Sequence, residues 1–129
     1  VAVTPASGFV NPTGAFIVGI VAGVLCYISA VKVKHMFGYD DSLDAFGVHG
    51  IGGIIGALLT GVLADPAINS LSSGASLGKQ VYGVAVTIVW TAVATFVILY
   101  IVKALVGLRP TTQEEVEGLD ISQHGEVVP

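Results

Sequence analysis

The sequence predicts an all-α membrane protein in which this chain supplies three transmembrane helices. Hydrophobic residues make up 53% of the 129 residues and charged residues only 11%, whereas a soluble domain carries about 25% charged residues. The apolar residues also gather in three long blocks, and each block approaches the roughly 20 residues that a helix needs to cross a bilayer. The composition therefore favours a lipid environment over the core of a soluble domain.

The three blocks form a membrane region at residues 1–106, with helices expected at about 14–34, 43–64 and 80–105. Lysines end the first block, an Asp-Pro pair ends the second, and a loop rich in Ser and Gly precedes the third. Proline makes continuation of a helix costly. Long runs without period-two alternation favour helices over strands, and a helix satisfies its own backbone groups inside lipid.

The basic residues predict the orientation of these helices. Lys32 and Lys34 lie between the first two blocks, and Lys103 and Arg109 follow the third. Because successive helices alternate in direction, both regions lie on one side of the membrane, and their positive charge marks that side as cytoplasmic. The tail at residues 107–129, which holds five of the nine acidic residues, is then cytoplasmic. We expect a multi-pass protein of the plasma (cell inner) membrane.

Several classes of function are excluded. The chain has no basic patch of the kind that binds nucleic acid. Cys26 is the only cysteine, so neither a disulfide framework nor a thiolate metal site can form, and a small buried hydrophobe is its expected role. The catalytic motifs and metal-ligand clusters of enzymes are missing, so we expect neither an enzyme nor a cofactor. The chain begins at Val1 with no signal-peptide pattern, and we expect the N-terminal part of a longer protein to precede it.

His49 is the most informative residue, because it lies in a run without charged side chains that continues to Ala64. Bilayer interiors exclude titratable groups unless they face a cavity, a partner or a pathway. A neutral imidazole offers one hydrogen-bond donor and one acceptor. His49 therefore either makes a hydrogen bond between helices or lines a pathway for a small polar solute or a proton. A proton relay would need a second base from outside these three blocks.

Small residues predict close helix contacts, because two GxxxG pairs occur, Gly19 with Gly23 and Gly52 with Gly56. Four positions of the second block recur at helical spacing and are expected to share a face turned toward protein or a lumen: His49, Gly53, Gly56 and Thr60.

Two carboxylates stand at the start of the second helix. Asp41 or Ser42 is a suitable N-cap, and a carboxylate in the first turn interacts favourably with the helix dipole by roughly 0.3–1 kcal/mol. Such a capping role is the plain explanation of Asp44, and a role in a pathway is the alternative.

Residues 40–61, DDSLDAFGVHGIGGIIGALLTG, closely resemble the signature of the ammonium transporter family, which is related to the Rhesus glycoproteins. Residues 106–126, VGLRPTTQEEVEGLDISQHGE, resemble the cytoplasmic C-terminal segment of that family. With residues 87–90 between them, the resemblance spans most of the chain. It implies a homotrimer of eleven-helix subunits built from inverted repeats. This chain would supply helices nine to eleven and the tail.

The resemblance also implies site residues and a mechanism. His49 matches the second member of a pore-lining histidine pair, Asp44 matches the Asp at the start of helix ten, and Ala45 and Phe46 lie near the pore. Ammonium, or methylammonium as its analogue, would lose a proton near the pore entrance, and ammonia would cross the narrow hydrophobic pore. Desolvating an intact ammonium ion is costly, which explains the separation of proton and ammonia. The first pore histidine and the Phe gate belong to helices outside this chain.

For the tail, the resemblance implies a regulatory segment that touches neighbouring subunits and lies near the docking surface of the nitrogen-sensing PII protein. Its candidate residues are Gly118, Asp120, Ser122 and His124. Some relatives carry a phosphorylated Thr at the position of Ser122, where phosphate would add a charge of about -1.5 to -2; an ordinary solvated hydroxyl is the alternative. Two other functions stay open, a regulatory or assembly module that binds PII and a fragment of another small-solute transporter. The DAFGVHGIGG motif argues against the second.

Overall fold

The computed structural model describes residues 1–127 and contains two compact units, the first ending at Thr87 and the second beginning at Ile88. No strand forms within the described range, where one isolated bridge pairs Val10 with Ala64. Three helices are long and apolar enough to cross a membrane: Pro12–Phe37, Phe46–Leu63 and Leu77–Leu105. The predicted all-α class with three transmembrane helices is therefore confirmed.

The first span joins three helical stretches, α1 (Pro12–Ile28), the π-helical η2 (Ser29–Val33) and α2 (Lys34–Phe37). Its start is capped by Asn11, whose side-chain oxygen accepts the N–H of Gly14 at 2.9 Å. Pro12 occupies the first helical position, where a missing N–H removes no helical hydrogen bond. Gly38 ends the span in the left-handed conformation with φ 61°, as is common after the last helical residue.

The second span consists of the π-helical η3 (Phe46–Ile51) and α3 (Gly52–Leu63). The helical conformation begins at Ala45, later than the expected start near residue 43. The reason is the backbone of Asp44, whose φ of 53° lies in the left-handed region and cannot continue a right-handed helix. The span ends where Ala64 turns to an extended conformation, just before Asp65.

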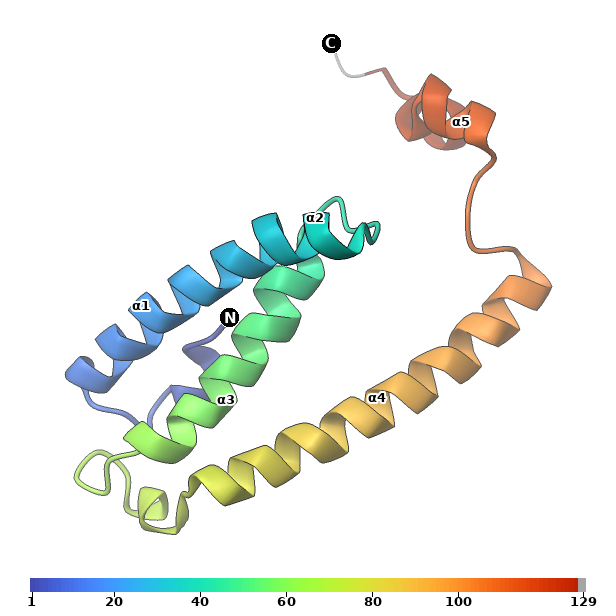
Figure 1. Ribbon diagram of the computed structural model, residues 1–129. Helices are drawn as coiled ribbons and strands as arrows, with labels where there is room; N and C mark the ends of the chain where they lie inside the picture. Colours follow the sequence, from blue (N-terminus) through green and yellow to red (C-terminus); the bar gives the residue numbers. More distant parts are fainter. Residues whose placement is uncertain (128–129) are drawn as a thin grey trace. The chain divides into compact units, whose positions relative to one another are not determined.

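The first two spans pack side by side, and the N-terminal segment with η1 (Thr4–Ala6) lies against α3 (Figure 1). The buried positions on both spans are mostly small, and most of them recur four residues apart, with wider gaps between Ala22 and Ser29 and between Gly47 and Gly52. They are Gly14, Val18, Ala22 and Ser29 on the first span, and Gly47, Gly52, Gly56 and Thr60 on the second. The core between the spans is therefore built from close backbone contact and not from large side chains.

The two GxxxG pairs behave differently. A Cβ atom at Gly56 would lie 2.0 Å from the carbonyl oxygen of Ala2, and one at Gly52 would lie 3.1 Å from Sγ of Cys26. This pair is a close contact, as predicted. Gly19 and Gly23 have no atom within 4 Å of an added Cβ. The first pair therefore makes no contact within the described residues.

The face predicted to unite four positions of the second span is divided. Gly56 and Thr60 are buried, whereas Gly53 is open on the side where its Cβ would lie and His49 is exposed. The four positions thus differ in burial among the described residues, and the prediction that their shared face is turned toward protein or a lumen stays a prediction. His49 lies in the π-helical η3, whose wider turns shift its direction relative to the α-helical residues that follow.

Polar contacts join the start of the first span to the end of the second span. The Asn11 amide donates to Oδ2 of Asp65 at 2.9 Å, and the Asp65 backbone N–H donates to the carbonyl of Phe9 at 2.8 Å. Ser72, in the short helix η4 (Ser70–Gly74), is buried and donates to the same carbonyl at 3.4 Å. The backbone N–H of Ala67 and the Asn11 amide hold the pKa of the Asp65 carboxyl below its usual value.

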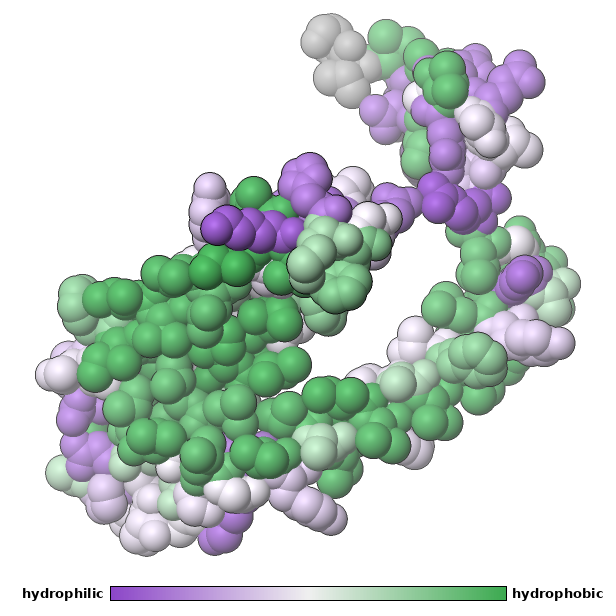
Figure 2. Space-filling model, in the orientation of Figure 1, coloured by the Kyte–Doolittle hydropathy of each residue, from purple (hydrophilic) through white to green (hydrophobic). Residues whose placement is uncertain are grey.

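α4 (Leu77–Leu105) is apolar on every side, with exposed aromatic side chains such as Tyr82, Trp90 and Phe96 along its length. At 1.5 Å per residue, its 29 residues rise about 43 Å, more than the roughly 30 Å of a hydrocarbon core. Figure 2 shows hydrophobic residues covering the visible sides of the spans and hydrophilic residues gathered near their ends. This distribution is typical of helices surrounded by lipid or by other membrane helices.

The contact between Gly56 and Ala2 predicts unequal effects of two alanine substitutions. Gly56→Ala should lower the stability of the detergent-purified protein by about 1–3 kcal/mol, because the new methyl group displaces the N-terminal segment. Gly53→Ala, three residues away with open space at its Cβ position, is the matched control. Thermal unfolding followed by circular dichroism measures both. Equal melting temperatures for the two variants would contradict the packing described above.

Candidate functional site

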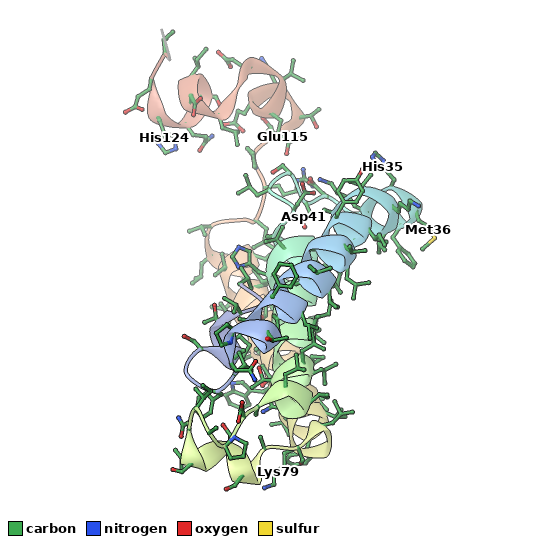
Figure 3. The ribbon with its side chains drawn as sticks, turned by 90° about the vertical axis from the view of Figure 1, so that its left-hand side faces the viewer. His35, Met36, Asp41, Lys79, Glu115 and His124 are labelled. Atoms are coloured by element: carbon green, nitrogen blue, oxygen red, sulfur yellow. The ribbon has the colours of Figure 1, made fainter. Side chains whose placement is uncertain are left out.

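The turn before the second span is held by Asp41. Its two carboxylate oxygens accept the backbone N–H groups of Ala45 and Phe46, each at 2.8 Å. These N–H groups have no partner inside a helix, so a carboxylate beside them is well placed to cap its start. Of the two predicted capping residues, Asp41 takes this role. Figure 3 shows Asp41 above the first turns of the second span.

Asp44 has a different partner from the one expected. Its Oδ1 lies 2.7 Å from Nζ of Lys34, at the end of the first span. The same ammonium group also donates to the backbone carbonyl of Asp41. Lys34 therefore connects the first span to two residues of the turn, and the plain capping explanation of the Asp44 carboxylate is wrong in this structure. Side-chain exposures of 27% for Lys34 and 41% for Asp44 leave the ion pair half-buried.

An aromatic contact lies on the same turn. The rings of Tyr39 and Phe46 meet edge to face, with centroids 5.8 Å apart and planes at 83°. They line an open pocket of about 470 Å³ together with Asp40, Asp41 and Ala45. The sequence-predicted residues Ala45 and Phe46 thus border a recess at the end of the span.

His49 lies one turn further along η3, and its side chain is exposed. No hydrogen bond joins its ring to another of residues 1–127. On the opposite side of η3, Gly47 is buried, and a Cβ there would lie 3.0 Å from the backbone nitrogen of Ala30. Packing thus fixes one side of η3 against the first span, while His49 and Phe46 are turned outward. The interhelical hydrogen bond considered for His49 is not formed within the described chain.

Sequence reasoning missed the role of Lys34, which it used only as a marker of orientation. The ion pair joins residues ten positions apart across a turn, so no helical spacing connects them. The available signal was the presence of a lysine at the end of an apolar helix, opposite a turn with three aspartates.

The tail contains a small folded element. α5 (Thr112–Glu117) begins with a capping box, in which Glu114 accepts the Thr111 N–H at 2.7 Å and the Thr111 hydroxyl accepts the Glu114 N–H at 3.3 Å. The backbone N–H of Thr111, the hydroxyl of Thr111 and the amide of Gln123 hold the pKa of the Glu114 carboxyl below its usual value. Arg109 adds an ion pair with Glu115 at 2.9 Å.

The candidate residues of the tail lie around the connection from α5 to the π-helical η5 (Asp120–His124). Gly118 makes this turn with φ 101°, which a residue with a side chain rarely adopts. The Ser122 hydroxyl is half-buried and donates to the carbonyl of Gly118 at 2.9 Å. His124 and Asp120 are exposed, and Figure 3 shows His124 and Glu115 on this same helical element.

Comparisons with known proteins agree over almost the whole chain. The model of the Ammonium Transporter Family matches residues 1–128. An ammonium transporter of Aquifex aeolicus is 49% identical over 98% of this chain and 31% of its own length. One of Bacillus subtilis is 44% identical over 98% of this chain and 33% of its length. A putative ammonium transporter of Methanothermobacter thermautotrophicus is 42% identical over 96% and 32%. The chain thus spans about a third of the length of these curated relatives.

The capping box predicts how the tail responds to acid. Because the pKa of Glu114 is lowered in the folded tail, this carboxylate stabilises α5 above the pKa it has in the unfolded chain, and the contribution is lost as the pH falls through the folded-state value. In Thr111→Val the hydroxyl is lost and the backbone N–H stays, so the pKa of Glu114 should rise part of the way. Carboxyl carbon shifts in NMR titrations measure both values. An unchanged midpoint in Thr111→Val would contradict the capping geometry.

Proposed function

Because this chain belongs to the Ammonium Transporter Family, we propose that it forms the C-terminal part of an ammonium transporter and supplies one wall of a narrow hydrophobic pore lined by His49. The observation that carries this proposal is the position of His49. The ring lies on a transmembrane span, in a run without charged side chains, and points away from the packed side of its helix. A titratable group that faces away from the core at membrane depth suits a pathway.

The mechanism follows from the cost of moving charge through a dry pore. An ammonium ion loses much of its hydration energy there, whereas neutral ammonia does not. Ammonium gives up its proton to water near the outer entrance, ammonia passes the imidazole of His49, and ammonia then takes a proton from water in the cytoplasm to re-form ammonium. One imidazole nitrogen donates a hydrogen bond and the other accepts one, so the ring can bind ammonia in transit. Asp44, Ala45 and Phe46 lie near the cytoplasmic end of this route.

The remaining surfaces suit a larger assembly in the membrane. Gly19 and Gly23 are open on the first span, and the apolar side chains of α4 are exposed. Small residues favour helix neighbours, and large apolar residues are equally stable against lipid. These surfaces support a homotrimer of multi-helix subunits in the plasma membrane. The basic residues after the first and third spans favour a cytoplasmic position for the tail.

We also propose a second function, which would belong to the tail. Residues 111–125 form their own capped helical element, with Asp120 and His124 exposed and the Ser122 hydroxyl directed to the backbone. An element of defined shape on the cytoplasmic side suits recognition by a PII signalling protein. In this role the chain is a regulatory or assembly module in addition to its part in the pore.

The pore proposal predicts that His49→Ala changes methylammonium uptake, or the charge moved with it, in a full-length transporter that contains this chain. The expected change is at least tenfold in one of the two, because the substitution removes both hydrogen-bonding nitrogens from the pathway, and positioned groups of this kind contribute about 10²–10⁴-fold. Radiolabelled uptake into proteoliposomes measures flux, and currents on supported membranes measure charge.

His35→Ala is the matched control, because His35 is exposed at the end of the first span. It should leave both quantities unchanged. If His49→Ala folds normally and retains both flux and charge movement, His49 is not in the pathway.

The tail proposal predicts that PII binding requires the folded element after Arg109. Truncation after Arg109 should abolish capture of purified PII. Gly118→Val should weaken capture without deleting any residue, because φ 101° is strained for valine. A pull-down from defined proteins measures both. Undiminished capture by the truncated protein would reject the tail as the PII site.

A further inference from the structure

The first span contacts η3 and the turn before it through a row of three residues spaced four apart: Cys26, Ala30 and Lys34. The Cys26 thiol lies 3.9 Å from the carbonyl oxygen of Val48, as a weak donor. The backbone of Ala30 lies against Gly47, close enough that a Cβ at Gly47 would be 3.0 Å away. Lys34 completes the row with its ion pair to Asp44. The first two contacts fall on η3, the segment on which His49 lies, and the third falls on the turn that precedes it.

Of these three contacts, the one made by Lys34 acts on the point where the segment begins. The backbone of Asp44 has φ 53°, a left-handed conformation that is unfavourable for a residue with a Cβ. The carbonyl of Asp44 accepts the N–H of Val48 at 2.9 Å. The orientation of the Asp44 peptide therefore determines the direction of the backbone immediately before His49.

We propose that Lys34 is a positioning residue for His49. Its ammonium group holds the carboxylate of Asp44 and the carbonyl of Asp41, keeps the turn in its left-handed conformation, and thereby sets the direction of the imidazole along η3. Lys34 does not touch the transported solute in this role. The inference rests on the proposed function, because it assigns to Lys34 an effect on the residue that lines the pore.

The alternative is that Lys34 stabilises the fold without influencing His49. A purely structural lysine would lower uptake by the same factor whether or not residue 49 is a histidine. A lysine that acts through His49 loses its effect once the imidazole is gone, since the two changes are then coupled and not additive. A double-mutant cycle in a full-length transporter containing this chain separates the two cases.

The experiment compares methylammonium uptake by proteoliposomes containing the parent protein, Lys34→Gln, His49→Ala and the double variant. Lys34→Gln is expected to lower uptake about tenfold in the parent, within the roughly 100-fold that a 1 Å misplacement can cost. In the His49→Ala background the same substitution should change uptake by less than about twofold. Lys34→Arg, which keeps a cation of similar length, should restore at least half of the uptake. Equal effects of Lys34→Gln in both backgrounds would overturn the inference.

Two further variants keep the test decisive. Lys32→Gln, two residues away and exposed, is the matched control and should leave uptake unchanged. If Lys34→Gln does not fold, Asp44→Asn removes the ion pair from the other side, and the same coupling with His49→Ala is expected. If His49→Ala changes neither uptake nor the charge moved with it, the pore proposal fails. If His49→Ala lowers uptake and neither Lys34→Gln nor Asp44→Asn does, only the inference about Lys34 fails.

Discussion

Close backbone contact between the first two spans is the constraint on which the rest of the first unit depends. Between helices in lipid there is no hydrophobic driving force, so association relies on van der Waals packing and hydrogen bonds. Gly47 and Gly52 permit this packing, since a side chain at either would meet the first span at 3.0–3.1 Å. The short separation brings the Lys34 ammonium within 2.7 Å of Asp44. It also commits one side of η3 to packing and leaves the other side, with His49, free.

Hydropathy and the residues that end the apolar runs predicted the fold class. They reflect the burial of apolar side chains in lipid and the need to satisfy every backbone hydrogen bond there. A long apolar run must satisfy its backbone groups internally, and only a helix does so within a single segment. Asp65 and Pro66 ended the second span as expected. The details that failed depend on local backbone geometry. Neither the left-handed φ of Asp44 nor the π-helical turns of η3 has a residue signature in this sequence, since aspartate adopts the left-handed region only occasionally and Phe46–Ile51 (FGVHGI) contains no proline to interrupt an α-helix.

The candidate site was predicted in part, for a related reason. His49 was recognisable because a histidine in an uncharged run is rare and costly at membrane depth, and the surrounding motif added the resemblance. Lys34 was not recognisable as a contact of Asp44, because their pairing depends on how the chain reverses direction at Gly38 and Tyr39. Tertiary ion pairs across a turn follow no period of helix or strand. The sequence predicted Asp41 or Ser42 as the cap of the second span, and the structure shows Asp41 in that position.

The exposed features of the chain support one another as parts of a pore wall. The exposed imidazole of His49 forms no hydrogen bond with acyl chains. Larger apolar residues would contact lipid more extensively than the open glycines of the first span do. The exposed imidazole and the open glycines are both suited to neighbouring helices that approach closely and leave a narrow passage. The packed side of η3, in contrast, is already occupied by Cys26 and Ala30, and Lys34 holds the turn before it. A pore-lining side chain acts only if its orientation is fixed. A helix that is packed on one side and exposed on the other meets this requirement, because packing on one side fixes the direction of the residues on the other.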